Sequence, residues 1–143
     1  MIFPVLRFDF RLHPRLTDNV WQAQMAGCPK ILTYNGIDPL ARRDARRNAM
    51  RFDHDGARYE IPHIESRDEY PFACAVEGGA RSWVGHVPPA ENSAQGGLIS
   101  AFLRQNGFVR GARFRVEPIN HPQGRVTRPC RSACAGCPSP CRY

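Results

Sequence analysis

The sequence contains no long apolar run and no recognisable secretory signal. No stretch approaches the roughly 18 apolar residues that a membrane-spanning helix needs, so we expect no membrane insertion. Residues 2–12 (IFPVLRFDFRL) show no basic segment followed by an apolar block and a small-residue cleavage site. We therefore expect a protein that is secreted or delivered, if it leaves its cell, without a classical signal peptide or on a longer parent chain.

Lysine is almost absent. Lys30 is the only lysine among the 20 basic residues; the others are arginines, whose planar side chains can hold a phosphate through two hydrogen bonds. The formal net charge of +7 predicts a polyanionic partner, because phosphate neutralisation supplies most of the sequence-independent affinity for nucleic acid. A GC-rich coding sequence, which favours arginine, explains the bias equally well, so charge alone decides little.

Acidic residues are missing after Glu117, where prolines recur and four of the six cysteines lie. A chain of 143 residues can form one modest core, since single domains commonly have about 100–150 residues. We therefore predict one folded domain over residues 1–119 and a Pro- and Cys-rich basic tail over residues 120–143. The tail arginines would tether DNA electrostatically.

The tail cysteines are Cys130, Cys134, Cys137 and Cys141. Their thiols could bind one structural Zn²⁺, although such sites usually use two cysteine pairs separated by a longer span. Two disulfides, or an unstructured tail with reduced thiols, fit equally well. Outside the tail, Cys74 is predicted to be a small core residue or to pair with Cys28.

The hydrophobic pattern predicts several strands and two N-terminal helices. Apolar residues alternate with charged ones over residues 6–12 and 113–117, which is typical of strands with one buried face, and residues 31–34 form a brief strand. Thr17 or Asp18 is expected to cap a first helix that ends before Gly27. Asp38 and Pro39 are expected to open a second helix that reaches about Met50.

A hairpin followed by a helix is predicted in the second half of the domain. Two apolar runs, residues 72–76 and 83–87, are joined by a Gly-rich turn at residues 77–80. Asn92 or Ser93 can cap the helix that follows. Its apolar stripe consists of Leu98, Ile99, Phe102 and Leu103. The expected fold class is therefore α+β.

Three polar blocks surround this hairpin: RDEYPFA at residues 67–73, EGG at 77–79 and PAENSAQGG at 89–97. Phosphodiester hydrolysis needs a group that takes a proton from the attacking water and a divalent cation that stabilises developing charge. Carboxylates before a hairpin and carboxamides at the start of a helix can supply one group each. An Asp–Glu pair alone is weak support, because paired acids are usually solvated.

Together the three blocks resemble the signature of the NucA/NucB deoxyribonuclease family, and Asn19 to Tyr34 resembles the N-terminal part of that family. The resemblance extends from about Val5 to Val116. It implies a compact ββα-metal nuclease core and metal-dependent, sequence-non-specific cleavage of DNA. The form GGLISAFLRQNG is similar to versions at the toxin ends of bacterial polymorphic, Rhs-type effectors, which implies an interbacterial effector with an immunity protein as partner.

The resemblance also implies roles for individual residues. Asp68 stands where the general base is expected, with Glu69 beside it, and Asn92 matches the carboxamide that holds Mg²⁺ or Mn²⁺, directly or through water. Glu77 and Gln95 occupy matching positions with a supporting role. The ion would be held by Asn92 and, if it is not the base, by Asp68.

An aspartate is a feeble base at neutral pH, since its ordinary pKa is near 3.9. Desolvation or the neighbouring Glu69 would have to raise the pKa of Asp68. Otherwise Asp68 is a metal ligand and His86, on the second hairpin strand, is the alternative base. A lone histidine on a strand is more often packed or solvent-facing than catalytic.

Candidate DNA contacts are Arg67, Gln95 and the arginines of the second helix, Arg42 and Arg46 above all. An arginine face of this kind either lies against DNA or is simply solvated. Two rival functions remain open: a non-catalytic DNA-binding module with a zinc element, and an RNase on the same scaffold. The sequence contains no recognition helix with base-reading side chains, which suits contacts to the DNA backbone.

Overall fold

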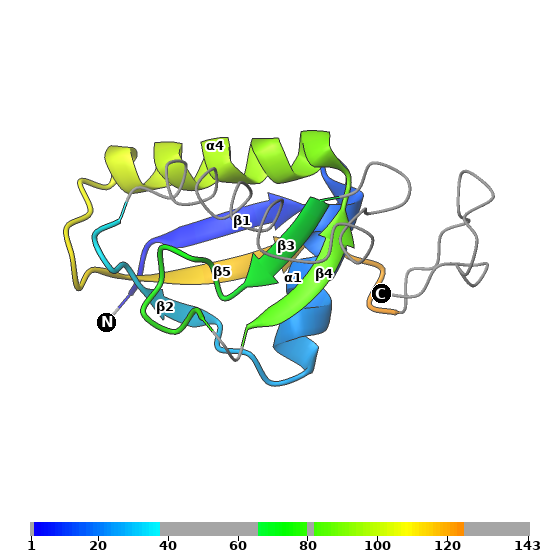
Figure 1. Cartoon of the computed structure of the whole chain (residues 1–143), viewed down its shortest axis with the longest axis horizontal. Coiled ribbons are helices and arrows are strands. Elements are labelled where there is room, and N and C mark those ends of the chain that lie inside the picture. The colour runs from blue at the N-terminus through cyan, green and yellow to red at the C-terminus, as the bar shows by residue number, and fades with distance from the viewer. Residues whose placement is uncertain (1, 38–65, 80–81, 125–143) are drawn as a thin grey trace, which may run out of the picture.

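The computed structural model describes residues 2–37, 66–79 and 82–124. The elements are β1 (Val5–Asp9), α1 (Pro14–Met25), β2 (Ile31–Thr33), β3 (Ser66–Tyr70), β4 (Trp83–Val87), α4 (Pro89–Gln105) and β5 (Arg113–Ile119) (Figure 1). This confirms the predicted α+β class. No helix in the described ranges has the length and apolar character required to cross a membrane.

A three-stranded sheet has the order β1-β5-β2, with β5 parallel to β1 and antiparallel to β2. The predicted alternation is confirmed, because Leu6 and Phe8 are buried while Arg7 between them is exposed. Phe114 and Val116 are buried in the same way on β5. The first strand is shorter than predicted: it ends at Asp9, and Leu12 is 71% exposed in the turn that follows.

The hairpin is formed by β3 and β4, which pair antiparallel with Asp68 opposite Gly85. The prediction of a strand at residues 72–76 is wrong, since this segment is a turn-rich loop with a single bridge from Ala75 to Tyr34. Phe72, Cys74 and Ala75 of this segment are buried in the core, where Phe72 packs edge-on against Phe8 at 5.9 Å between ring centroids, whereas Val76 is exposed. The strand instead covers residues 66–70, and so includes the acids that were expected to precede the hairpin.

Cys74 lies in this loop and is fully buried in the core. No disulfide joins it to Cys28, so the interpretation as a small core residue is confirmed and the pairing is wrong. The four tail cysteines lie outside the described residues, and so does the predicted second helix at residues 38–50.

Both predicted helix caps are wrong. Helix α1 begins at Pro14, so Thr17 and Asp18 lie inside it, and α4 begins at Pro89, ahead of Asn92. Proline suits the first helical position, where its missing N–H would have no partner within the helix. The apolar stripe is also partly wrong, because Leu98 is 38% exposed. The buried side of α4 instead consists of Asn92, Gln95, Gly96, Ile99, Ser100 and Leu103.

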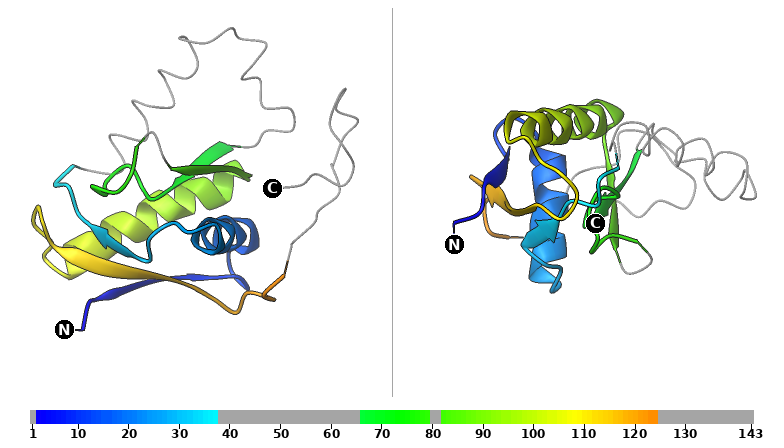
Figure 2. Two further views of the ribbon diagram at one scale, coloured as in Figure 1. Left: turned by 90° about the horizontal axis from the view of Figure 1, so that it is seen from below. Right: turned by 90° about the vertical axis from the view of Figure 1, so that its left-hand side faces the viewer.

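Helix α1 lies between the three-stranded sheet and the hairpin, and contacts β1, β3, β4, β5 and α4 (Figure 2). Its N-terminus is capped from a distance: Glu91 Oε1 accepts the backbone N–H groups of Arg15 at 3.1 Å and Leu16 at 3.4 Å. A carboxylate at this position also interacts favourably with the helix dipole. The first turns of α1 and α4 are thereby fastened together.

The chain beyond β5 packs back onto α1. His121 Nε2 lies 2.8 Å from Asp18 Oδ1, and both side chains are 2% exposed. The His121 ring stacks on Trp21 with ring centroids 4.3 Å apart and an interplanar angle of 7°. Residues 120–124 had been assigned to the tail, yet this pair is buried in the folded domain. A deletion that tests the tail alone should therefore begin at residue 125.

We expect His121→Ala to lower the free energy of unfolding by about 1–3 kcal/mol, because Asp18 would lose its hydrogen-bond partner and Trp21 its stacked ring. Urea unfolding followed by circular dichroism measures this change. Pro122→Ala, at an exposed neighbouring position, is the matched control and should have little effect. Equal stability of the two variants would contradict the proposed importance of the pair.

Candidate active site

Asp68 lies in the middle of β3 and is 3% exposed. Side chains on a strand alternate between its faces, so Asp68 shares a face with Tyr70, which is fully buried. The partner residue on β4 is Gly85, which presents no side chain to this face. The strand thus places one carboxylate against α1 in the interior.

Two carboxamides from different helices converge on this carboxylate. Asn19 Nδ2 on α1 donates to Asp68 Oδ2 at 2.8 Å, and Gln95 Nε2 on α4 donates to the same oxygen at 3.4 Å. Asn19 Oδ1 in turn accepts a hydrogen bond from Trp83 Nε1 at 2.9 Å. These four side chains form one network that joins the hairpin to both helices.

Burial raises the pKa of Asp68 to about 7. The hydrogen bonds from Asn19 and Gln95 oppose this shift because they favour the charged carboxylate, while the negative charge of Glu69 adds to it. Desolvation or Glu69 was expected to raise this pKa. Burial is the main cause, whereas Glu69 raises the pKa through its charge and lowers it through a backbone hydrogen bond. A carboxyl with this pKa can exchange a proton near neutral pH.

Asn92 and Gln95 lie one helical turn apart on the same side of α4, with exposures of 5% and 6%. The structure therefore brings Gln95 into contact with Asp68 and places Asn92 on the face of α4 that includes this contact. Gln95, predicted to contact DNA, holds the carboxylate in the described structure.

Glu69 and His86 lie on the other face of the hairpin. Glu69 is opposite Val84, and Arg67 is opposite His86, so these positions share a face that excludes Asp68. His86 is exposed. As the alternative base, it would have to act from the face opposite the Asp68 network. Arg42 and Arg46 lie outside the described residues, and for Arg67 only the backbone is described.

Glu77 lies against β2. Its Oε2 accepts the backbone N–H of Thr33 at 2.9 Å, and its Oε1 accepts the Thr33 hydroxyl at 2.8 Å. Both carboxylate oxygens thus fasten the loop after β3 to the three-stranded sheet. This arrangement supports the position of β3 rather than contact with a substrate.

Asp68 and Asn92 carry oxygen atoms of the kind that hard divalent cations bind. The described ranges contain no group of three or more Asp, Glu, His or Cys side chains that could form a complete metal cage. Mg²⁺ does not require such a cage, since it prefers oxygen ligands and commonly takes one or two carboxylates, with water and substrate phosphate completing its shell. The Asp68 carboxylate and the Asn92 carboxamide offer oxygens of this kind.

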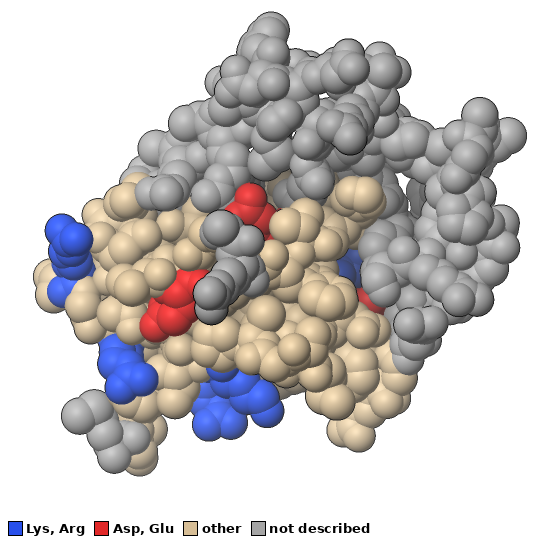
Figure 3. All heavy atoms as spheres, turned by 60° about the horizontal axis from the view of Figure 1, so that its bottom comes forward, with Lys and Arg blue, Asp and Glu red and all other residues tan. Residues whose placement is uncertain are grey.

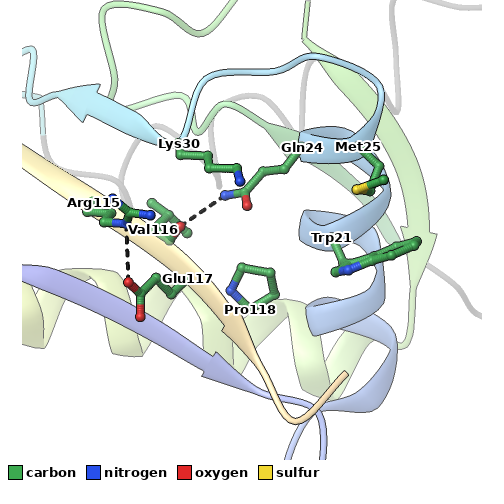
Figure 4. Close-up of a pocket in the computed structure, with 8 residues that line it drawn as sticks. All are labelled: Trp21, Gln24, Met25, Lys30, Arg115, Val116, Glu117 and Pro118. Atoms are coloured by element: carbon green, nitrogen blue, oxygen red, sulfur yellow. Dashed lines mark hydrogen bonds and ion pairs between the residues drawn. The ribbon is translucent and has the colours of Figure 1, made fainter. Parts of the chain in front are cut away.

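A hollow of about 260 Å³ lies elsewhere, beside α1 and β5 (Figure 4). Lys30 and Arg115 are among the residues that line it. The positive charge of Arg115 is paired there with Glu117, at 3.1 Å from Arg115 Nε. No lining residue of this hollow belongs to β3, β4 or α4. The hollow is therefore separate from the Asp68 network.

Sequence reasoning missed Asn19 and Trp83 as members of the site, and Glu91 as a cap. Asn19 is 49 residues from Asp68, and Glu91 is 76 residues from Arg15. No local pattern reports such contacts. Asn19 and Glu91 both lay within segments that carried the family resemblance, which was the one available signal.

A family model described as "Deoxyribonuclease NucA/NucB" matches residues 21–117, which is more than half of the chain. The matched range includes Asp68, Trp83, Asn92 and Gln95. It begins two residues after Asn19. A search of the curated proteins finds no match for this chain.

Asp68→Asn should stabilise the metal-free protein, and more so as the pH rises. The pKa of Asp68 is raised from 3.8 to about 7, so the wild type loses stability as the pH rises through this range, whereas asparagine does not titrate. One pKa unit corresponds to about 1.4 kcal/mol, and the stability difference should grow by several kcal/mol between pH 4 and pH 8, about the span of the shift. Urea unfolding in chelator measures it, and a pH-independent difference would contradict the burial argument.

Proposed function

The chain belongs to the NucA/NucB deoxyribonuclease family, and we propose that it is a metal-dependent, sequence-non-specific endonuclease that hydrolyses DNA phosphodiester bonds. The observation that carries this proposal is the buried Asp68 carboxylate, held by amides from α1 and α4 next to the hairpin. A buried acid with a strongly shifted pKa and specific partners is a common mark of a catalytic group.

Asp68 is the general base of the proposed reaction. Both amide hydrogen bonds reach Oδ2, which fixes the orientation of the carboxylate that would take the proton from the attacking water. The water then attacks phosphorus in line with the leaving 3′ oxygen. A base of matched pKa commonly contributes a factor of roughly 10² to 10⁴ in rate.

Asn92 is the proposed ligand of Mg²⁺ or Mn²⁺, directly or through water. When bound, the ion supplies stabilisation of the negative charge that develops on the phosphate and the leaving oxygen. A cation bound directly to Asp68 would lower its pKa and weaken it as a base. We therefore assign the base to Asp68 and the direct or water-mediated ligation to Asn92.

The substrate is proposed to be held by its backbone. Figure 3 shows one face of the molecule on which Lys and Arg side chains form separate groups, with acidic residues between them. Separate cations of this kind can contact phosphates without reading bases. Arg42, Arg46 and Arg67 remain proposed contacts. Parallel digestion of DNA and RNA distinguishes this function from an RNase, which the same phosphodiester chemistry would permit.

The proposed setting is interbacterial antagonism. Residues 96–107 (GGLISAFLRQNG) resemble the toxin ends of polymorphic effectors. We propose delivery into a target cell without a classical signal peptide, action on DNA there, and a neutralising immunity protein in the producer. A structural Zn²⁺ at the tail cysteines also remains a proposal.

Asp68→Ala should lower plasmid cleavage by about 100-fold or more, because the proposed base is removed. EDTA should abolish cleavage by the wild type. His86→Ala is the matched control, since it removes the alternative base from the opposite face of the hairpin, and it should retain activity. Full cleavage by folded Asp68→Ala would refute the assignment, and wild-type cleavage in EDTA would refute metal dependence.

Deleting residues 125–143 should weaken DNA binding most at low salt. The deletion removes four arginines, Arg125, Arg128, Arg131 and Arg142, and each phosphate contact contributes to the salt dependence through counterion release. Fluorescence anisotropy of labelled DNA with the Asp68→Ala protein, at several salt concentrations, measures the slope. An unchanged slope would remove the tail from the DNA interface.

A further inference from the structure

We propose that Asn19 is a positioning residue of this site, which holds the Asp68 carboxylate through Oδ2 and so fixes its orientation for the proton transfer. The inference rests on the proposed function of Asp68. It assigns to α1 an indirect part in the proposed reaction, through the contact of Asn19 with Asp68.

The contacts of Asn19 leave its amide only one orientation. An indole N–H is a donor and never an acceptor, so Asn19 Oδ1 must face Trp83 Nε1, at 2.9 Å. The amide nitrogen of Asn19 therefore faces Asp68. It lies 2.8 Å from Asp68 Oδ2 and 3.4 Å from the backbone oxygen of Asp68. Trp83 thus determines that Asn19 presents a donor to the carboxylate rather than a second acceptor.

Gly85 provides the space for this arrangement. A Cβ at position 85 would overlap Oδ1 of Asn19. Gly85 is also the residue paired with Asp68 across the hairpin. The absence of a side chain on β4 therefore allows the asparagine to reach the opposite strand.

Helix α1 is held in place by contacts that do not involve Asp68. Glu91 caps its first turn, and Asp18, the neighbour of Asn19, pairs with His121. Asn19 itself is 4% exposed. A side chain on a helix fixed in this way is preorganised, which is what positioning a reacting group requires.

A buried asparagine can also serve folding alone, so the test must separate the two roles. Asn19 is buried and contacts Asp68 and Trp83, so its loss should lower kcat while KM stays unchanged. A structural role would instead reduce the folded fraction. It would not make the effect of Asn19 depend on the presence of Asp68.

The experiment measures kcat and KM on a defined DNA duplex with Mg²⁺, using full-length variants whose folded fraction is checked by urea unfolding. Asn19→Ala should lower kcat roughly 10- to 100-fold, the cost of a misplaced reacting group, with KM unchanged. Trp83→Phe keeps the ring but removes the N–H that orients the amide, and should give a smaller loss of kcat. Asn35→Ala is the matched control: this half-buried asparagine donates to Ala73 O at 3.0 Å, and kcat should not change.

The double variant Asn19→Ala/Asp68→Ala should be no slower than Asp68→Ala, because Asn19 acts through Asp68. Asn19→Ala with wild-type kcat, together with inactive Asp68→Ala, would overturn this inference and leave the proposed function intact. Full activity of Asp68→Ala would instead overturn the proposed function. If Asn19→Ala does not fold, Trp83→Phe decides: an unchanged kcat in that variant would also overturn the inference.

Discussion

A carboxylate removed from water must be protonated or hydrogen-bonded, and Asp68 sets this requirement at the centre of the described fold. The strand supplies the carboxylate, and the amides that stabilise its charged form come from α1 and α4. Burial raises the pKa of Asp68 while the amides limit the rise. The balance between desolvation and hydrogen bonding depends on keeping both helices close to β3.

The contacts that keep them there lie away from Asp68. Glu91 ties the first turn of α1 to α4, and Glu77 ties the loop after β3 to β2. His121 covers the far side of α1 through Asp18 and Trp21. These supports bind atoms other than the Asp68 carboxylate, but they hold the helices that carry Asn19 and Gln95. Changing them is therefore expected to affect both the stability of the domain and the geometry around Asp68.

Some residues that position Asp68 lie outside the range that the family model matches. The family model matches residues 21–117, which include the β3–β4 hairpin and α4. Asn19 and His121 lie outside this range. Asn19 joins α1 to the Asp68 carboxylate, and His121 contacts Asp18 and Trp21 on the same helix. The positively charged side chains are separate from the Asp68 network. They are dispersed over the face shown in Figure 3, and none of them belongs to the network. Binding and catalysis are therefore expected to depend on different residues.

The sequence alone determined the features that depend on near neighbours. Alternation identified β1 and β5, and the motif blocks identified the family. It misplaced the first hairpin strand, because Phe72 and Cys74 are apolar for the sake of the core and not of a strand. It also misplaced the start of α1, since the cap comes from Glu91, 76 residues away in the chain from Arg15. Only tertiary structure could decide the pKa of Asp68 and its contact with Asn19, because desolvation and hydrogen bonding depend on which distant segments the fold brings together.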